Sequence, residues 1–540
     1  MFKKKKVPSV AYFCMEYGLE SAFKIYAGGL GILAGDYLKG AKDYEYPIIG
    51  VGIKWKQGYG EQVIGKNNYP FDAYYINNYK FLEDTGVSVK VKIRNRDITC
   101  KVWKVEQFGN VPLYLLDTDV PGNEDPWITG QLYGWFGEER VAQEMVLGIA
   151  GVRALRALGV DVEVYHFNEG HAVFAGFELI REKMEQGMDF DHAMAAVRNQ
   201  IVFTTHTPVL QGNEEHYLER LNYMGANNGL TVEQLIAIGG APFNMTVAAL
   251  RLARKSNAVA ALHADTANKM WAHVEGRSQI IGITNAVHLP TWVDPNILNL
   301  AENGKDEEVW GAHSQNKLRL IDFIKERNGV ELDPEVLLIG FARRAVGYKR
   351  SDLIFRDEAV INPLLKERRL QLVFAGKSHP LDDQGKEIIA RLVQLSRLYP
   401  EAVVFLENYD MNIAHYLTRG SDVWLNNPRR PLEASGTSGM KAAMNGVLNC
   451  SILDGWWPEA CQHGKNGWQF GDGFESHDHG AQDYHDLRAL YHVLQKEVIP
   501  TYYNHRDQWI KMMRQSILST KDAFGMKRML EEYYDKLYQS

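Results

Sequence analysis

Short apolar runs separated by amphipathic stretches recur along the second half of the chain. The runs are rich in Val, Leu, Ile and Phe, as buried strands are, and they occupy residues 336–344, 370–377, 402–408, 422–427 and 447–453. Residues 386–399, between two of these runs, carry apolar side chains at helical spacing. Strands that alternate with helices in this way predict a parallel α/β sheet.

The first half of the chain repeats this pattern less regularly. Residues 46–55 and 97–108 are predicted strands among glycine-containing turns. A helix is predicted over residues 137–158, because apolar residues recur there at three- and four-residue steps and Gly159 can end it. Two further buried strands are predicted within residues 160–171 and 201–206.

These patterns predict two doubly wound α/β domains, which we place at residues 1–325 and 326–540. The polar segment 302–315 is expected to lie close to the boundary between them. The amphipathic tail from about residue 487 is expected to be helical, with its last helix packing back on the N-terminal domain. Ligands bind beyond the carboxyl ends of strands in open parallel sheets, so two facing domains of this kind are expected to enclose a cleft.

Composition narrows the class of protein without identifying it. Hydrophobic residues make up 45% of the 540 positions and charged residues 24%, which excludes a disordered or fibrous chain. The formal net charge of −7 argues against a protein built to coat nucleic acid. Trp and Tyr offer flat faces that suit sugar rings, but on composition alone a large core is the simpler explanation of their number.

Cysteine usage and the N-terminus predict a cytoplasmic protein. The four cysteines, at positions 14, 100, 450 and 461, include no C-x-x-C pair, so we expect reduced thiols. The basic start MFKKKK is followed by Pro8 and Glu16 without an apolar export segment. No window approaches 18 consecutive apolar residues, so no membrane span is expected.

A glycine-rich turn at residues 26–36 is the first candidate for binding chemistry. Gly29, Gly31 and Ala34 fit the spacing G-x-G-x-x-A, and exposed N–H groups at such a turn can hold a phosphate. A dinucleotide site would need an acidic residue after the next strand, which here ends at Lys54. NAD is therefore disfavoured, while an anion site and a purely structural turn both stay open.

Histidines follow two of the predicted strands. His166, Glu169 and His171 invite comparison with a zinc site, but their spacing matches no common zinc motif, so no metal is expected. The motif TTHTP contains His206. Both His171 and His206 are predicted to hydrogen-bond a polar ligand, the alternative being loop histidines that bond only to backbone.

Two further segments are suited to anions. Arg343, Arg344, Lys349 and Arg350 gather after a buried strand, where they form either a phosphate trap or a solvated helix end. The turn at residues 435–439 precedes a predicted helix and could cradle a phosphate. Lys441 follows among apolar residues, where a neutral amine could form a Schiff base with pyridoxal phosphate. On spacing alone, an ordinary helical lysine is the simpler interpretation.

Taken together, these motifs resemble the α-glucan (glycogen, starch and maltodextrin) phosphorylase family. The resemblance covers most of the chain in order, with EASGTSGMKAAMNG its most specific motif. The matching segments are residues 27–34, 168–171, 205–208, 245–264, 282–292, 343–350, 404–410 and 433–446.

The resemblance implies a fold and a reaction. The fold is the GT-B architecture, in which two Rossmann-like domains face each other across a cleft. The reaction is phosphorolysis of α-1,4-glucan ends by inorganic phosphate, which releases α-glucose 1-phosphate with retained configuration. Pyridoxal phosphate is the implied cofactor, and its 5′-phosphate takes part in proton transfer. A cytoplasmic homodimer without nucleic-acid or membrane partners is expected.

The resemblance also assigns roles to individual residues. The expected catalytic residues are Lys441, which would hold the cofactor, and Arg344, Lys349 and His206. The other expected cofactor contacts are Arg343, Thr437, Ser438, Trp292 and Tyr409. The expected substrate contacts are Gly29, Leu30, His171, His206, Asn285, Glu433 and Gly439.

Physical reasoning agrees with this assignment, although three alternative functions stay open. Two phosphates a few ångströms apart repel each other, and a cationic cluster lowers that cost. Proton transfer through phosphate removes the need for a pair of catalytic carboxylates, which the sequence does not show. The rivals are a sugar-nucleotide-dependent GT-B glucosyltransferase, a catalytically silent glucan-binding protein and a glycoside hydrolase with two carboxylates. Because only a short stretch precedes the glycine turn, animal-type regulation is not expected, and the preferred glucan length stays open.

Overall fold

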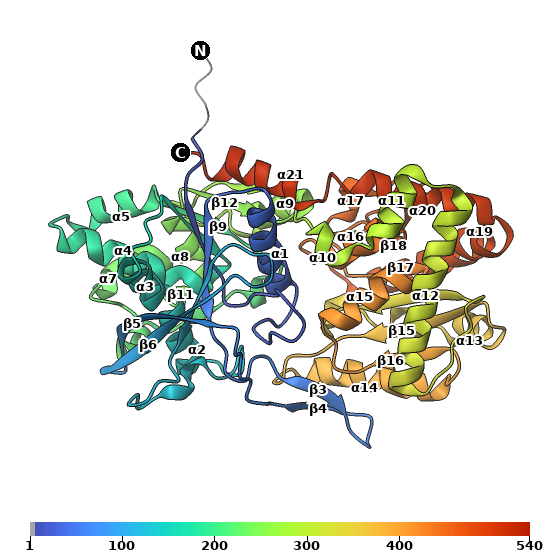
Figure 1. Ribbon diagram of the computed structural model, residues 1–540, viewed down its shortest axis with the longest axis horizontal. Coiled ribbons are helices and arrows are strands. Elements are labelled where there is room, and N and C mark those ends of the chain that lie inside the picture. The colour runs from blue at the N-terminus through green and yellow to red at the C-terminus, as the bar shows by residue number, and fades with distance from the viewer. Residues whose placement is uncertain (1–5) are drawn as a thin grey trace, which may run out of the picture. The chain divides into compact units, whose positions relative to one another are not determined.

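A computed structural model describes residues 6–540, and this part of the chain divides into two compact units (Figure 1). Unit 1 comprises Met1–Gly60, Tyr74–Thr284 and Met526–Ser540. Unit 2 comprises Glu61–Ala73 and Asn285–Gly525. Each unit contains a mainly or wholly parallel sheet with helices packed on it, which confirms the predicted α/β class.

Among the described residues, unit 1 holds a nine-stranded sheet in the order β13-β12-β9-β8-β1-β2-β7-β6-β5. Its strands are β1 Val10–Phe13, β2 Ile48–Ile53, β5 Glu83–Ile93, β6 Arg96–Val105, β7 Leu113–Asp117, β8 Val164–Asn168, β9 Ile201–Thr204, β12 Lys255–Ala258 and β13 Ile280–Gly282. Strands β13 to β7 are parallel, and β6 and β5 extend the sheet in antiparallel fashion. Because β1 lies in the middle, the chain winds outward in both directions from it.

The helices of unit 1 follow the predicted periodicity where it is strongest. They are α1 Gly29–Asp43, α2 Glu138–Met145, α3 Gly151–Ala157, α4 Val173–Glu185, α5 Phe190–Arg198, α6 Leu218–Met224, α7 Val232–Gly239, α8 Met245–Leu252, α9 Ala261–Met270 and α21 Met526–Glu532. The helix expected over residues 137–158 is confirmed as α2, a π-helical turn at Val146–Ala150, and α3. Gly159 follows it with a φ of +69°.

The C-terminal segment belongs to unit 1 and packs against its sheet and first helix. Helix α21 lies against α1, where a Cβ on Gly40 would come within 2.9 Å of the Cβ of Met526. The hydroxyl of Tyr538 lies 2.7 Å from Nδ1 of His166, which is fully buried in β8. A buried imidazole therefore anchors the end of the chain.

Among the described residues, unit 2 holds a six-stranded parallel sheet in the order β16-β15-β14-β17-β18-β19. Its strands are β14 Leu337–Ala342, β15 Leu370–Ala375, β16 Val403–Leu406, β17 Val423–Asn426, β18 Leu448–Ile452 and β19 Gly467–Phe470. The first five confirm the predicted strands, and β19 was not predicted. A hairpin of β3 Glu61–Ile64 and β4 Pro70–Ala73 joins this unit through the Ile64 N–H, which donates to Glu407 at 2.7 Å.

Helices cover the sheet of unit 2, and one of them corrects the sequence analysis. The helices are α10 Leu289–Trp292, α11 Pro295–Asn303, α12 Asp306–Asn328, α13 Glu358–Lys366, α14 Asp383–Leu398, α15 Met411–Gly420, α16 Thr437–Met444, α17 Trp457–Ala460, α18 His479–Val493, α19 Ile499–Asn504 and α20 Arg506–Thr520. The segment 302–315, expected beside a domain boundary, lies mostly in α12. At its polar start the Lys305 N–H donates to the Glu308 carboxylate at 2.9 Å, and Val309 and His313 are buried.

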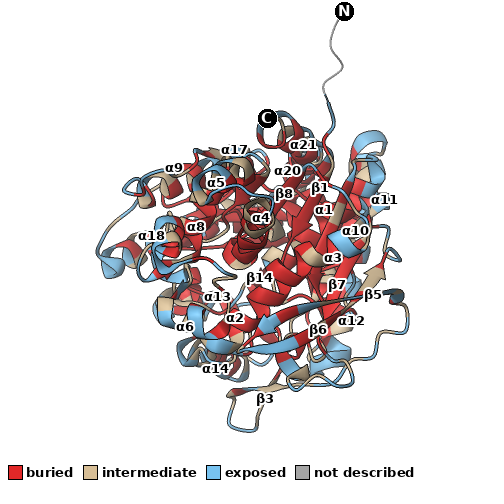
Figure 2. Ribbon diagram, turned by 90° about the vertical axis from the view of Figure 1, so that its left-hand side faces the viewer, coloured by how far each residue is buried: buried red, intermediate tan, exposed pale blue. Residues whose placement is uncertain are grey.

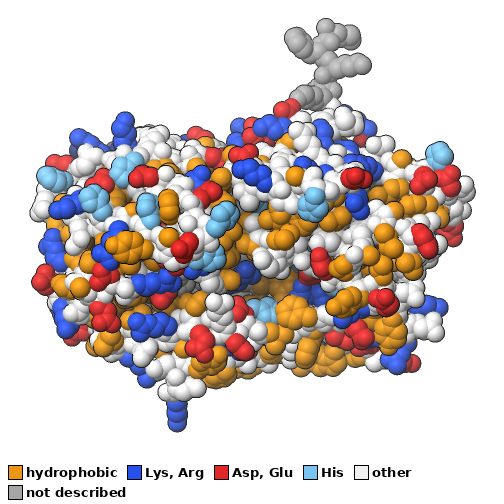
Figure 3. Space-filling model, turned by 180° about the vertical axis from the view of Figure 1, so that it is seen from behind, with side chains coloured by type: hydrophobic (Ala, Val, Ile, Leu, Met, Phe, Trp, Pro, Cys, Tyr) orange, Lys and Arg blue, Asp and Glu red, His pale blue; other side chains and the backbone are white. Residues whose placement is uncertain are grey.

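The compact units therefore divide the chain elsewhere than at residue 325. Helices α11 and α12 contact α20 and α15, so residues 285–325 pack with the second sheet. Figure 2 shows central strands such as β1, β8 and β14 as buried, as runs such as Leu337, Ile339 and Phe341 require, whereas β5 and β6 at one edge are largely intermediate or exposed. On the face seen in Figure 3, hydrophobic side chains are interspersed with charged ones. None of the helices in the described part of the chain is long and apolar enough to cross a bilayer.

Candidate active site

Lys441 lies on α16 and is 2% exposed. Helix α16 starts after Gly436, whose φ of +87° is a left-handed conformation that favours glycine. The Lys441 ammonium lies 4.0 Å from the centre of the Trp292 ring, and that ring stacks on His415 at 4.5 Å. The predicted cofactor lysine and the predicted cofactor-stacking Trp are thus neighbours.

Asn445, at the end of α16, ties the backbones of Lys441 and Trp292 together. Its Oδ1 accepts the Asp294 N–H at 2.9 Å, and its Nδ2 donates to the carbonyls of Trp292 at 3.1 Å and Lys441 at 2.9 Å. The carboxamide is fully buried and uses both of its N–H donors. The backbone of Lys441 is therefore held in register with that of Trp292.

Two members of the predicted cationic cluster converge on one carboxylate, whereas a third, Arg350, is buried against Asp483 and Asp486 and is not available to a ligand. Arg343 and Lys349 both bind Oε2 of Glu433, Lys349 at 2.7 Å. Burial alone raises the pKa of Glu433, but the two cations outweigh burial and lower that pKa to about 2. Arg344, which follows the end of β14, is exposed. The cluster is thus a buried ion group with one solvent-facing guanidinium.

A second buried carboxyl, Asp454, supports the loop that carries Glu433. It accepts the N–H of Glu433 at 2.9 Å and that of Gly455 at 2.9 Å. Burial and the neighbouring Glu433 charge raise the pKa of Asp454 to about 8. Gly455 has a φ of +61°, and a Cβ there would lie 2.3 Å from the Ser435 carbonyl oxygen. Only glycine allows this approach.

Two buried polar atoms, one on the turn before α16 and one on the segment after β14 that lies beside this turn, lack a hydrogen-bond partner among the described residues. They are Ser435 Oγ and Arg343 Nε. Both lie beside a helix N-terminus whose cap, Gly436, offers no side-chain acceptor. The hydroxyl of Ser438 is hydrogen-bonded to Tyr409, whose pKa is raised by burial. Donors without acceptors at a helix N-terminus are suited to a phosphate.

In unit 1, the glycine turn is organised by an acid that the sequence analysis did not single out. Oε1 of Glu16 accepts the N–H groups of Ala27, Gly28 and Gly31, each at 3.0 Å. Burial raises the pKa of Glu16. Gly29 and Leu30 open α1, with Gly29 exposed. On its inner side the turn is therefore held by Glu16, and on its outer side Gly29 is accessible to a ligand.

His206 follows β9 and is held by residues at the end of β8. Its Nε2 lies 2.6 Å from Oδ1 of Asn168, and its N–H donates to Glu169 at 2.9 Å. Burial lowers the pKa of His206 to about 3, so the ring is neutral at physiological pH. Asn168 was not predicted as a site residue, because only the folded sheet brings it beside His206.

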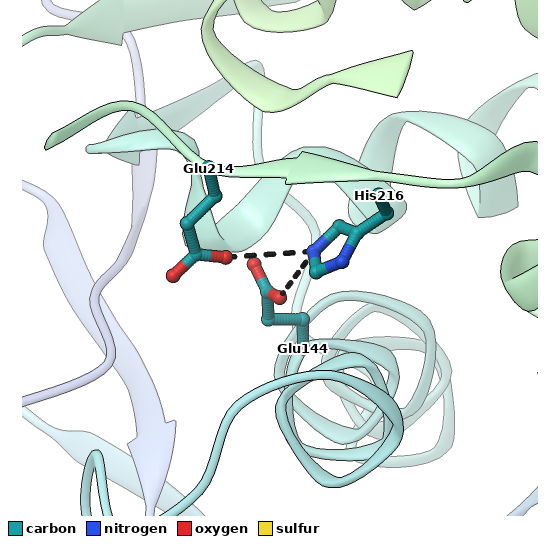
Figure 4. Close-up of side chains that lie close together, drawn as sticks. All are labelled: Glu144, Glu214 and His216. Carbon is teal, nitrogen blue, oxygen red and sulfur yellow. Dashed lines mark hydrogen bonds and ion pairs between the residues drawn. The ribbon is translucent and has the colours of Figure 1, made fainter. Parts of the chain in front are cut away.

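Glu144, Glu214 and His216 form a cluster of ionisable side chains near His171 (Figure 4 shows the first three). Nε2 of His216 lies 3.3 Å from Oε1 of Glu144 and 3.5 Å from Oε2 of Glu214. Arg140 also binds Glu214, and His171 Nε2 lies 3.7 Å from it. Burial lowers the pKa of His216, but its bonds to both glutamates outweigh this and raise it to about 9.

The spacing of Glu144, Glu214 and His216 is that of a candidate cation site in the described part of the chain. Arg140 and His216 already contact these carboxylates, so cationic side chains occupy the place that a metal ion would take. The trio considered from sequence is not brought together as ligands. His166 instead lies 2.6 Å from the Thr204 hydroxyl and 2.7 Å from that of Tyr538.

The expected site residues fall into two sets. Unit 2 carries Trp292, Arg343, Arg344, Lys349, Tyr409, Glu433, Thr437, Ser438, Gly439, Lys441 and the buried Asn285. Unit 1 carries Gly29, Leu30, His171 and His206. Glu16, Asn168, Asn445 and Asp454 were missed. A single acid directly after an apolar strand, as in CMEYG and ILDGW, is the signal that points to Glu16 and Asp454.

Three neutral buried histidines predict a loss of stability in mild acid. Burial lowers the pKa values of His166, His171 and His206 to about 3, 4 and 3 from an ordinary value of 6.5. Below pH 6.5 the unfolded chain therefore binds more protons than the folded chain. As the pH falls below 6.5, each histidine therefore lowers the free energy of unfolding by about 1.4 kcal/mol per pH unit, until the pH reaches the pKa of that histidine in the folded protein.

Urea unfolding between pH 6.5 and 4.5 measures this dependence. The variant His166→Gln is expected to reduce the slope of unfolding free energy against pH by about 1.4 kcal/mol per pH unit, which corresponds to one proton. His477→Gln, at an exposed position, serves as the control and should leave the slope unchanged. Equal slopes for the parent and His166→Gln would contradict a neutral buried His166.

Comparison with known proteins adds independent information. A family model described as carbohydrate phosphorylase matches residues 295–535. The maltodextrin phosphorylase of Thermococcus litoralis is 40% identical, covering 98% of this chain and 70% of its own length. The glycogen phosphorylase of Aquifex aeolicus is 39% identical, covering 98% and 86%, and that of Mycobacterium bovis is 37% identical, covering 98% and 70%.

Proposed function

Because the chain belongs to the carbohydrate phosphorylase family, we propose that it is an α-1,4-glucan phosphorylase. It transfers the terminal glucosyl group of a glucan to inorganic phosphate, giving α-glucose 1-phosphate reversibly and with retained configuration. The two parallel α/β sheets agree with the GT-B class. The carrying observation is a buried lysine on a helix whose N-terminus holds unpaired donors.

Pyridoxal phosphate is the cofactor that fits this helix. Lys441 would attach it, and Trp292, whose ring lies 4.0 Å from the Lys441 ammonium, and Tyr409, which is bonded to Ser438, would pack near its ring. Arg343 and Ser435 carry buried polar atoms without partners, which suits the cofactor phosphate. When bound, the cofactor supplies a phosphate that exchanges a proton during the reaction.

The remaining residues have proposed roles in binding substrate. Arg344 and Lys349 of unit 2, and the Gly29 N–H of unit 1, are proposed ligands of inorganic phosphate, since they offer charged or backbone donors. The proposed contacts of the glucan are Leu30, His171, His206, Asn285, Glu433 and Gly439. Glu433 is ionised, so it can only accept hydrogen bonds from sugar hydroxyls.

Phosphorolysis itself is the test of the proposal. Purified protein loaded with pyridoxal phosphate is incubated with maltodextrin, with or without inorganic phosphate. Glucose 1-phosphate that forms only with phosphate is the expected result. Free glucose or maltose without phosphate would identify a hydrolase, and transfer from a sugar nucleotide would identify a glucosyltransferase. No turnover with any of these donors would leave the silent glucan-binding alternative.

Lys349 gives a residue-level prediction for the same assay. Lys349→Gln removes a charge-assisted donor, so kcat/KM for inorganic phosphate is expected to fall by about 10- to 100-fold. Lys366→Gln, at the exposed end of α13, is the matched control and should behave as the parent. An unchanged KM for phosphate and an unchanged kcat in Lys349→Gln would remove Lys349 from the phosphate site.

Assembly and location complete the proposal. We expect a cytoplasmic homodimer, as the family resemblance implies, without nucleic-acid or membrane partners. Light scattering at several protein concentrations measures the mass directly, and a mass of one chain at every concentration would contradict the dimer.

A further inference from the structure

Unit 1 exposes a series of large aromatic and aliphatic side chains that the proposed active site does not use. They are Tyr75, Ile76, Trp127, Trp135, Phe136 and Tyr217, with exposed fractions of 60, 62, 50, 53, 62 and 65%. Trp127 and Trp135 are the only exposed Trp side chains in the described part of the chain. We call these six residues the aromatic strip.

The first half of the strip is held together by one backbone segment. The Lys56 N–H donates to the Thr129 carbonyl at 2.9 Å, and the Lys56 carbonyl accepts the Asn77 N–H at 2.9 Å. Segment 56–58 therefore runs between the segment that carries Tyr75 and Ile76 and the one that carries Trp127. The Lys56 ammonium lies 4.5 Å from the Trp127 ring, which fixes that ring at the surface.

The second half of the strip consists of Trp135, Phe136 and Tyr217, which are connected by a turn and two arginines. Gln131 bonds to Gln57 at 2.9 Å and packs against Gly134, just before Trp135 and Phe136. The Arg140 guanidinium lies 5.3 Å from the Phe136 ring. A Cβ on Gly137 would lie 3.6 Å from the Arg220 guanidinium, which is 5.5 Å from the Tyr217 ring. The contact between helices α2 and α6 keeps Tyr217 near Phe136, and the Gln131–Gln57 bond joins this half of the strip to the first half.

The chemistry of the strip is that of a carbohydrate-binding surface. Flat rings present apolar faces to sugar rings, and neighbouring side-chain amides and cations can bond to hydroxyls. Gln57, Asn77, Gln131 and Arg220 supply such groups beside the rings. Exposed apolar surface of this extent on a folded protein usually marks a binding site.

Tyr133 connects the strip to the proposed substrate contacts of unit 1. Its hydroxyl is hydrogen-bonded to Glu16, which holds the glycine turn, and its ring lies 5.6 Å from that of His171. Tyr133 has a φ of +57°, an uncommon conformation for a side chain other than glycine. Trp135 of the strip therefore follows, by two residues, a side chain that contacts both Glu16 and His171.

We propose that the aromatic strip binds α-1,4-glucan outside the glucosyl site and favours long glucans as substrates; this inference rests on the proposed function. Glucan stacked on the rings keeps one polymer chain near the enzyme through successive cleavages. Glucans too short to reach the strip gain nothing from it. The strip thereby gives a physical basis for chain-length preference.

Affinity electrophoresis and kinetics test the strip together. The double variant Trp127→Ala/Trp135→Ala is run in gels that contain amylose but no phosphate, and its KM is measured for amylose and for short maltodextrins. About 10-fold weaker retention and a similarly raised KM for amylose are expected, with kcat and the KM for short glucans unchanged. The variant Trp127→Phe/Trp135→Phe keeps the rings and should restore both values.

Tyr484 offers a matched control, because it is 67% exposed and lies 5.4 Å from Arg488, as Tyr217 lies beside Arg220. Tyr217→Ala should weaken amylose binding, and Tyr484→Ala should not. Equal weakening in both, or no weakening in the Trp double variant, would overturn the inference. Loss of a dimer in the Trp variant with unchanged amylose binding would assign the strip to contacts between copies and also overturn it. Gel retention does not depend on turnover, so failure of the phosphorylase proposal would be seen separately.

Discussion

Replacing Lys441 by Ala should give a folded protein that neither retains pyridoxal phosphate through gel filtration nor forms glucose 1-phosphate. We expect kcat/KM to fall by at least about 10³-fold, because a correctly placed charged group beside the reacting phosphate is lost with the cofactor. The two readouts are the absorbance of bound cofactor and phosphorolysis of maltodextrin, measured on the same sample.

The geometry explains why no neighbour can replace Lys441. Its ammonium is 4.0 Å from the Trp292 ring, and Asn445 holds the carbonyls of both residues. The side chain is enclosed at 2% exposure, so an amine elsewhere cannot reach the same point without moving α16. The loss should therefore persist in excess cofactor.

Lys39 provides the control for this experiment. It is also a buried helical lysine, at 6% exposure, but it lies on α1 in unit 1. Lys39→Ala is expected to bind pyridoxal phosphate normally, even where its stability is lower. Cofactor absorbance that survives gel filtration in Lys441→Ala would show that another residue holds the cofactor, and the proposed site would have to be abandoned.

The local sequence pattern was sufficient to predict most strands of the sheet in unit 2 and the helix α16. Apolar runs of four to six residues predict strands wherever both faces are covered, as β14 and β15 are. The turn before α16 was predicted because glycine and small polar residues have local conformational preferences. The same local pattern places Lys441 among apolar neighbours on a helix, but spacing alone favoured an ordinary helical lysine, and only the family resemblance assigned it the cofactor.

Contacts between distant segments could not be predicted in this way. Glu16 binds amides 11 to 15 residues later, and Asn168 reaches His206 across 38 residues. Asn445 pairs with a carbonyl 153 residues away. Such pairings depend on strand order, which no local pattern contains. Segment 302–315 fails for a different reason, because its charged first turn resembles a linker although it caps a helix.

Residues distant in sequence also form a buried hydrogen-bond network around Asp422, and we expect its removal to lower the free energy of unfolding. Asp422, fully buried before β17, accepts hydrogen bonds from Lys317 at 2.6 Å and from the Leu338 N–H at 2.8 Å, and its Oδ1 lies 2.8 Å from Nε2 of His313. Burial raises the pKa of Asp422, but Lys317 and His313 outweigh it and hold that pKa low. Lys317 also donates to the Tyr502 hydroxyl at 3.0 Å.

Asp422→Ala is expected to lower the free energy of unfolding by roughly 3–5 kcal/mol, because it leaves the Lys317 ammonium buried without a counter-charge. Urea unfolding followed by Trp fluorescence measures the change. Adding Lys317→Met to Asp422→Ala should recover part of the loss, since the stranded charge is then removed. Arg368→Ala, which breaks an ion pair whose side chains are 65% and 80% exposed, should cost less than about 1 kcal/mol. Equal losses in Asp422→Ala and Arg368→Ala would mean that water reaches Lys317 and that this network does not hold helix α12 to the sheet.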